Sequence, residues 1–264
     1  MLIDSHCHLI FNTFDEDRGD VLARAVEAGV VALINPGTDL EDSRRVVAAA
    51  EQIPQLYAAV GFHPNDAGDF DESTLAQLRQ LAQHPKVVAI GEIGLDYYWD
   101  KAPRPRQQEV FEQQLALAKA LAKPVIIHQR EAAVDTMAIL RQWAAGRDHP
   151  GLVLHSFSGD MAMAQEAIEL GFYLGISGPV TFKNARDLAE IVAAMPPERL
   201  LVETDAPFLS PHPLRGKRNE PARVKLIAER IAELKGDSFA AMSRQLTENT
   251  IELFKLEDNY VTSN

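Results

Sequence analysis

The chain has 264 residues, a length that suits either one α/β barrel or two small domains. Its 26 lysines and arginines against 38 aspartates and glutamates give a net charge of −12, which excludes a protein that binds nucleic acid over its whole surface. The single cysteine, Cys7, excludes an intrachain disulfide. The sequence shows neither the pattern of a signal peptide nor an apolar run of about 20 residues. We therefore expect a cytoplasmic protein without a membrane segment.

Short β-branched or leucine-rich runs recur along the chain, and each is followed by a longer stretch with apolar residues at helical spacing. This alternation predicts a parallel α/β fold. Eight candidate strands lie at residues 2–4, 31–35, 56–60, 87–92, 125–128, 152–155, 172–176 and 200–203. Eight such units in about 235 residues favour a TIM (β/α)8 barrel over an open doubly wound sheet, with residues 1–264 as a single domain.

The outer helices show their clearest periodicity in the C-terminal third of the chain. Residues 188–195 carry apolar side chains on one helical face, and residues 224–234 repeat the pattern with charges on the opposite face. Residues 238–254 form an extra helical pattern beyond the eighth unit, which we expect to form a cap on the outside of the barrel. The last ten residues, from Lys255, are expected to form a tail.

Histidines and carboxylates stand where the candidate strands end. His6 and His8 follow the first strand two positions apart, so strand alternation directs both imidazoles to one face. The other residues of this kind follow the fourth, fifth, sixth and eighth strands, and they are Glu92, His128, His155 and Asp205. By contrast, His84, His149 and His212 adjoin prolines and are interpreted as loop residues.

Any one of these residues alone is more often structural than functional. In a TIM barrel, however, the C-terminal ends of all strands meet at one rim, where the active sites of this fold lie. We therefore expect the six to converge there. Six nitrogen and carboxylate ligands exceed the three or four that one hydrolytic cation takes from a protein, so their number favours two metal ions.

Six motifs in combination resemble those of the TatD family of metal-dependent deoxyribonucleases, in the amidohydrolase superfamily. They are DSHCHL at 4–9, GEIGLDY at 91–97, PVIIHQR at 124–130, HSFSG at 155–159, ETDAP at 203–207 and RGKRNEP at 215–221. The resemblance, which runs from Ile3 to Phe254, implies a ligand set divided between two ions: His6, His8 and Asp205 for one, His128 and His155 for the other, and Glu92 as the bridge. It also implies a magnesium-supported nuclease that shortens single-stranded DNA from its 3′ end.

Two carboxylates of this set are expected to be catalytic. We assign Glu92 as the bridging ligand and Asp205 as a ligand that also accepts a proton from the attacking water. Glu203 is expected to orient Asp205 or a histidine ligand, with an ion pair inside the barrel as an equal alternative. Four imidazoles favour zinc or manganese by ligand type, whereas magnesium prefers oxygen, so the expected cofactor is two divalent cations of Mg, Mn or Zn.

A local excess of positive charge offers a docking place for a polyanion. Residues 215–225 contain five cations against Glu220 alone, a local charge of +4, although the same composition suits a solvated loop and the start of a helix. The expected substrate contacts are His63, Arg130, Lys183, Lys217, Arg218 and Asn219. The aromatic residues at 97–99 suit either stacking on an exposed base or closing the top of the barrel.

Other functions are compatible with the same scaffold. Barrels with such metals also hydrolyse small esters, lactones, cyclic amides or aminoacyl-tRNA esters, and fold alone does not separate these substrates. Many amidohydrolases bridge their metals with a modified lysine at the fourth strand, whereas this chain offers Glu92, which favours the TatD branch. A catalytically silent metal-binding scaffold is the alternative from another class, and a complete ligand set fits it least well.

Overall fold

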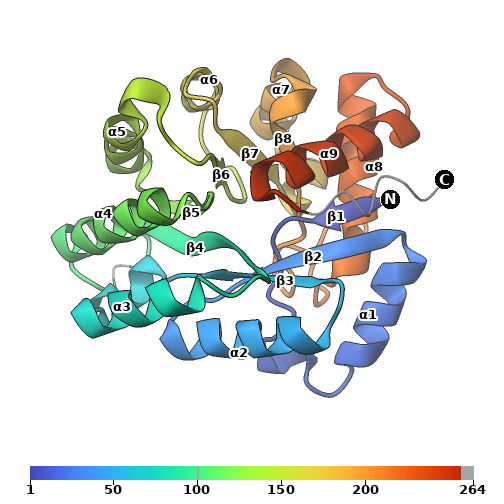
Figure 1. Ribbon diagram of the computed structural model, residues 1–264. Coiled ribbons are helices and arrows are strands. Elements are labelled where there is room, and N and C mark those ends of the chain that lie inside the picture. The colour runs from blue at the N-terminus through green and yellow to red at the C-terminus, as the bar shows by residue number, and fades with distance from the viewer. Residues whose placement is uncertain (100, 257–264) are drawn as a thin grey trace.

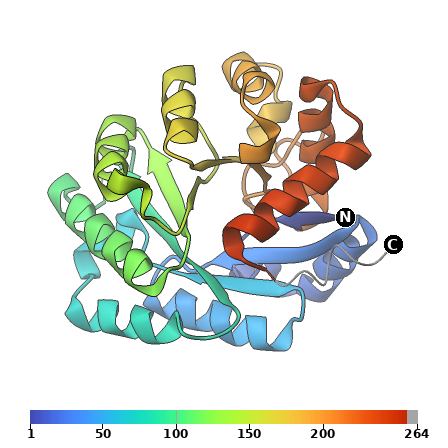
Figure 2. The same ribbon diagram turned by 45° about the horizontal axis from the view of Figure 1, so that its top comes forward.

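Eight parallel strands alternate with helices in the computed structural model, which describes residues 1–99 and 101–256. The strands are β1 (Leu2–Asp4), β2 (Val30–Pro36), β3 (Leu56–Val60), β4 (Val87–Asp96), β5 (Val125–Arg130), β6 (Leu152–Leu154), β7 (Tyr173–Ile176) and β8 (Leu200–Val202). Each strand pairs in parallel with the next, in the order β1-β2-β3-β4-β5-β6-β7-β8, and the helices surround them (Figures 1 and 2). The predicted (β/α)8 barrel is confirmed.

The α-helices cover the outer face of the sheet, except for the last one, which covers one end of the barrel. Within the described residues they are α1 (Arg18–Glu27), α2 (Leu40–Gln52), α3 (Glu72–Leu81), α4 (Arg104–Leu121), α5 (Ala133–Trp143), α6 (Met161–Glu169), α7 (Arg186–Ala194), α8 (Val224–Lys235) and α9 (Phe239–Phe254). Four of them begin at a side chain that accepts a backbone N–H of the first turn, which stabilises the helix start: Asp39, Asp71, Asp160 and Ser238. No helix in this part of the chain is long and apolar enough to cross a membrane.

Strand alternation divides the apolar residues into two layers. On β5, Val125 and Ile127 belong to the large cluster between the sheet and the helices, whereas Ile126 belongs to a smaller cluster inside the barrel. Every strand contributes to the inner cluster, for example with Ile3 from β1 and Leu201 from β8. The barrel is therefore filled by side chains below its rim.

Helix α9 closes the end of the barrel at which the strands begin. Its residues Ile251, Leu253 and Phe254 pack with the inner cluster, and the Asn249 side chain donates to the carbonyl oxygen of Leu200, where β8 starts, at 2.8 Å. Figure 1 shows α9, in red, crossing this end beside the N-terminus. The extra helix that the sequence predicts as a cap thus covers the end at which the strands begin, because its apolar face meets the barrel interior. Residues 257–264 of the expected tail lie outside the described residues.

Two strands extend further than predicted at the opposite end. The sequence pattern ended them at Glu92 and His128, but β4 continues to Asp96 and β5 to Arg130, with these last two residues paired across the strands. The rim is therefore raised between β4 and β5. This extension brings side chains near the predicted metal ligands that the sequence pattern did not place there.

Candidate metal centre

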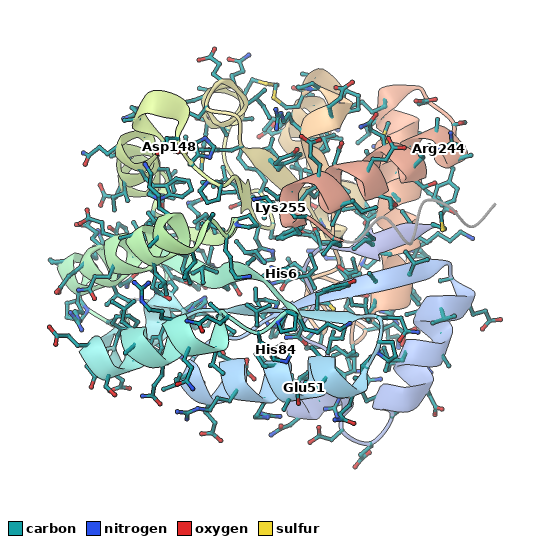
Figure 3. The ribbon with its side chains drawn as sticks, viewed as in Figure 1. His6, Glu51, His84, Asp148, Arg244 and Lys255 are labelled. Carbon is teal, nitrogen blue, oxygen red and sulfur yellow. The ribbon has the colours of Figure 1, made fainter. Side chains whose placement is uncertain are left out.

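The six predicted ligands meet inside the rim at the C-terminal ends of the strands. Figure 3 shows His6 within the ring of strands, whereas His84 pairs with Glu51 away from it, with a distance of 3.1 Å between His84 Nε2 and Glu51 Oε1. Alternation explains part of the convergence. Because Ile126 packs inside the barrel, His128, two residues further along β5, lies on the same side.

The segments after β1 and β8 carry three of the ligands and close the seam of the barrel. The N–H of Asp205 donates to the carbonyl oxygen of His6 at 2.9 Å, and the N–H of His8 donates to that of Ala206 at 2.7 Å. Both bonds join backbone atoms. The main chain itself therefore sets the positions of His6, His8 and Asp205 relative to one another.

Glu92 lies between two pairs of histidines. Its Oε2 lies 3.5 Å from His6 Nε2 and 3.7 Å from His8 Nε2, whereas its Oε1 lies 2.9 Å from His128 Nδ1 and 3.9 Å from His155 Nε2. Around this residue β4 shifts its register against β5, and such an irregularity redirects a side chain. A carboxylate with one oxygen toward each pair has the geometry that a ligand shared by two ions requires.

The first pair of histidines and Asp205 are spaced like the ligands of one metal ion. The Nε2 atoms of His6 and His8 lie 3.2 Å apart, and Asp205 Oδ1 lies 3.8 Å from the first and 3.6 Å from the second. Donor atoms around a tetrahedral cation with bonds of about 2.1 Å lie about 3.4 Å apart. The spacing and the imidazole and carboxylate chemistry of these side chains fit a divalent metal ion.

Two further carboxylates contact the second pair of histidines from outside. Asp96 Oδ2 accepts a hydrogen bond from His128 Nε2 at 3.0 Å, and Glu203 Oε1 lies 2.8 Å from His155 Nδ1. In both rings the remaining nitrogen faces Glu92. The hydrogen bond with Asp96 fixes the tautomer of His128, as a carboxylate does for a metal-ligating histidine, whereas Glu203 approaches His155 as an ion-pair partner. The expected role of Glu203 in orienting a histidine ligand stays a prediction, and its contact with His155 is an ion pair inside the barrel. Asp96 belongs to the GEIGLDY motif, but the sequence alone predicts no role for it.

The electrostatic field of the site favours positive charge. Burial by itself lowers the pKa of a histidine, but the carboxylates of Glu203 and Asp205 outweigh burial at His155 and raise its pKa to about 10. At His128 the hydrogen bond with Asp96 helps to outweigh burial in the same way and raises the pKa to about 8. At His8, in contrast, burial and the charge of His6 hold the pKa well below 6.5. The carboxylates therefore favour a positive charge at the second pair of histidines, and the same carboxylates would attract a cation there.

His63 lies at the edge of this cluster, with its ring centroid 4.4 Å from that of His128. Burial, together with the charge of His128, lowers the pKa of His63 to about 3, so the ring is neutral. Its Nδ1 accepts the backbone N–H of Asn65 at 3.2 Å, so the single ring proton is on Nε2. His63 therefore presents a hydrogen-bond donor, which suits a substrate oxygen better than a metal ion.

Asn219, one of the expected substrate contacts, has a structural role instead. Its side chain is buried, and its Nδ2 donates to the carbonyl oxygens of Thr204 and Phe208 at 2.9 Å and 2.8 Å. These bonds fix the segment that carries Asp205. The expectation that Asn219 contacts substrate is corrected, because both donors of its amide are used and no solvent reaches it.

The four expected cations lie in different surroundings. Arg130, Lys183 and Lys217 are exposed, and Lys183 lines a hollow of about 470 Å³ beside α7 and α8. Arg218, in contrast, is held by Asp17, with Nη1 and Nη2 donating to the two carboxylate oxygens at 2.9 Å and 2.5 Å. Part of the +4 charge of residues 215–225 is thus neutralised within the protein.

A (β/α)8 barrel that gathers four histidines and two carboxylates at its rim defines the class of metal-dependent hydrolases with this fold. The chain belongs to the family of TatD-related DNases, whose model matches residues 3–255. It is 46% identical over 256 residues to the uncharacterized metal-dependent hydrolase YabD of Bacillus subtilis (strain 168), an alignment that covers 97% of this chain and 100% of that protein.

Two further similarities extend over nearly the whole chain. The 3′-5′ ssDNA/RNA exonuclease TatD of Klebsiella pneumoniae (strain 342) is 36% identical, with 98% of this chain and 100% of that protein covered. The crystal structure of YjjV, a TatD homolog from Escherichia coli K12, is 36% identical and superposes with a TM-score of 0.91, covering 97% of this chain and 98% of that chain. Both the sequence and the fold therefore match the family along the full barrel.

Proposed function

We propose that the protein hydrolyses phosphodiester bonds of single-stranded nucleic acid, DNA above all, from the 3′ end with two divalent cations. The observation that carries this proposal is the placement of Glu92, whose two carboxylate oxygens face separate pairs of histidines. Nucleases and phosphatases use two ions about 3.5–4 Å apart, and a shared carboxylate supports such a pair. The name of the Klebsiella relative, a 3′-5′ ssDNA/RNA exonuclease, supports the substrate and the direction.

The ligands divide between the two ions as the family resemblance implies. His6, His8 and Asp205 would hold one ion, His128 and His155 the other, and Glu92 would be shared. Such ions, when bound, activate the phosphoryl group and the attacking water as Lewis acids. The imidazole-rich ligand set favours manganese or zinc for tight binding, and the family favours magnesium for catalysis.

The remaining roles follow from exposure and hydrogen bonding. The side chain of Asp205 is 13% exposed, compared with 5% for Glu92 and 0% for Glu203, so Asp205 is the carboxylate that faces the opening. We assign to Asp205 the acceptance of a proton from the attacking water. His63 donates from Nε2 to a phosphoryl oxygen, and Lys217 attracts the phosphate backbone.

The test is an assay of the metal-stripped protein with single-stranded DNA, single-stranded RNA and duplex DNA in Mg²⁺, Mn²⁺ or Zn²⁺. Substrates labelled at the 5′ end should give a ladder that shortens progressively, and substrates labelled at the 3′ end should release the label at once. Elemental analysis should give about two ions per chain at saturation. A stoichiometry that stays at one, or hydrolysis of lactones or small esters without any nuclease activity, would contradict the proposal.

A further inference from the structure

Two aromatic rings and a guanidinium group stack beside the metal centre, at the ends of β4 and β5. The Cζ atom of Arg130 lies 3.8 Å from the ring centroid of Tyr98 and 5.5 Å from that of Trp99. The two rings meet edge to face, with their centroids 5.1 Å apart. We call these three residues the stacking platform.

The stacking platform is open to solvent. Tyr98 is 49% exposed and Trp99 is 56% exposed, so these rings do not close the top of the barrel, the alternative that the sequence left open. Arg130 is exposed as well, and its guanidinium forms no ion pair with any described residue. Large rings and an unpaired planar cation at the rim of an active site are typical of a surface that receives a ligand.

One carboxylate fixes the stacking platform to the metal centre. Asp96 Oδ1 accepts the backbone N–H groups of Tyr98 and Trp99, both at 3.0 Å, while its Oδ2 lies 3.0 Å from His128 Nε2. In the backbone register of β4 and β5, Asp96 also lies opposite Arg130. The stacking platform and the metal ligand His128 therefore keep a constant relative position.

A hollow of about 710 Å³ adjoins the stacking platform, between the loops that follow β5 and β6. Its lining includes Arg130 but also three carboxylates, Glu131, Asp135 and Asp160. Such a lining repels a phosphate group, because the acidic side chains outnumber the single cation. A flat, uncharged group with hydrogen-bonding edges suits the hollow better.

We propose that the stacking platform is a subsite for a nucleobase of the substrate strand, next to the phosphate that is cleaved. This inference rests on the proposed nuclease function. It predicts that Arg130 contacts the face of a base, whereas the sequence suggested that Arg130 contacts a phosphate. Stacking on Trp99 and Tyr98 accepts every base, because each base has a π face, and the planar guanidinium of Arg130 adds a cation–π contact. The subsite binds single strands, since only an unpaired base offers its faces.

The fluorescence of Trp99 provides a direct measurement of binding. The chain has two tryptophans, and the second, Trp143, is half-buried with its Nε1 donating to the Leu115 carbonyl oxygen at 3.0 Å. The metal-loaded protein would be titrated with a phosphorothioate oligothymidylate and with an oligomer of equal length and charge that lacks bases at its 3′ end. We expect the base-bearing oligomer to quench the emission at a concentration about tenfold lower. In the variant Trp99→Phe the half-buried Trp143 is the remaining tryptophan. Its emission should not be quenched by either oligomer, and it serves as an internal control.

Kinetics then separate a base contact from a phosphate contact. Arg130→Lys keeps the positive charge but loses the planar group, and Trp99→Ala removes the ring. For the base-bearing oligomer made with normal phosphates, we expect both variants to raise KM between about 5-fold and 100-fold, with a smaller change in kcat, because stacking is the same in the ground and transition states. For the oligomer that lacks bases, KM should stay as in the wild type. Val26→Ala, an exposed apolar residue on the outer helix α1, is the matched control.

The outcomes are distinguishable. Equal quenching by the two oligomers overturns the inference, as does an Arg130→Lys variant with wild-type KM when Arg130→Gln is impaired, since a point charge would then suffice. Quenching that depends on the bases, without cleavage of either oligomer, supports the stacking platform and contradicts the proposed nuclease activity instead.

Discussion

Asp96 accepts a hydrogen bond from Nε2 of the His128 ring at 3.0 Å and thereby turns Nδ1 of that ring toward Glu92, 2.9 Å away. This contact exists because β4 continues past Glu92 and pairs with β5, with Gly94 opposite His128. Only glycine allows so close an approach, since Gly94 has φ +146° and a Cβ there would lie 1.9 Å from the His128 carbonyl oxygen. The orientation of a predicted metal ligand thus depends on a glycine in the neighbouring strand.

We expect Asp96→Asn to weaken metal binding by about 10–100-fold. The asparagine oxygen can still accept the backbone N–H groups of Tyr98 and Trp99, but the amide nitrogen cannot accept the His128 N–H. Competition against a chromophoric chelator measures the affinity, and thermal unfolding checks that the fold is kept. Asp135→Asn is a matched control, because that carboxylate accepts the Tyr97 hydroxyl at 2.7 Å and touches no predicted ligand. Equal chelator competition by wild type and Asp96→Asn would refute the positioning role.

Glu92→Gln and Asp205→Asn should each lower kcat strongly while the barrel stays folded. For Asp205→Asn we expect a loss of about 10²–10⁴-fold, because the amide cannot accept the proton of the attacking water. For Glu92→Gln we expect a comparable loss together with fewer bound ions, since the shared ligand loses its charge. Steady-state kinetics and elemental analysis of each variant measure the two effects. Near-native turnover in a folded Asp205→Asn variant would exclude its role as the proton acceptor.

The convergence of the ligands was predictable because it depends on periodic patterns. The apolar runs that form the strands are visible in the sequence, and alternation along a run such as 125–128 tells which side chain faces the interior. The common rim of a TIM barrel then brings strand-end residues together, whatever their separation in the chain. For this reason the sequence alone predicts that His128 and Asp205 lie near His6.

Contacts without a periodic pattern were not predictable. Gly91 and Gly94 interrupt the strand pattern before Asp96, and such an interruption is typical of a strand end. The sequence therefore does not predict that β4 continues to Asp96. The sequence predicts a local charge of +4 at residues 215–225, but Arg218 forms an ion pair with Asp17, about two hundred positions earlier in the chain. A local charge count contains no information on such a partner. Apolar periodicity predicts the capping helix α9 as well, but not which end of the barrel it covers, since periodicity gives a buried face and not its neighbour.

The start of α3 offers a test of stability against pH. Asp71 accepts the backbone N–H of Thr74 at 2.7 Å and its hydroxyl at 2.9 Å, and these bonds, the backbone bond foremost, lower the pKa of Asp71 below 3.8. Because the folded-state pKa is the lower one, the stabilisation is complete well above pH 3.8 and disappears as the pH falls through the folded-state value. Asp71→Ala should lower the Tm by roughly 2–4 °C at pH 7, and this difference should shrink below pH 3.8. Asp69→Ala, at an exposed aspartate nearby, should leave the Tm unchanged at both pH values.

Lys217 and Arg218 are neighbours in sequence but differ in their partners, and nucleic-acid binding should show this difference. Lys217 is exposed and forms no ion pair within the described part of the chain, whereas Arg218 donates to Asp17 and to the Thr13 carbonyl oxygen. Each phosphate contact to a single strand contributes a slope of about 0.7 in log affinity against log salt. We therefore expect Lys217→Ala to weaken binding of single-stranded DNA and to reduce that slope by about 0.7.

Arg218→Ala should change the salt slope little, because its charge is already offset by Asp17, and should lower the Tm slightly through the lost link to the segment after β1. Fluorescence anisotropy with labelled single-stranded DNA, between about 50 and 200 mM salt, measures both slopes. Metal content should not change in either variant, because neither side chain lies among the predicted metal ligands. Equal slopes for the two variants, both reduced, would mean that Asp17 releases Arg218 to the substrate. Two unchanged slopes would make this segment a solvated loop and would favour a small uncharged ester or lactone as the substrate.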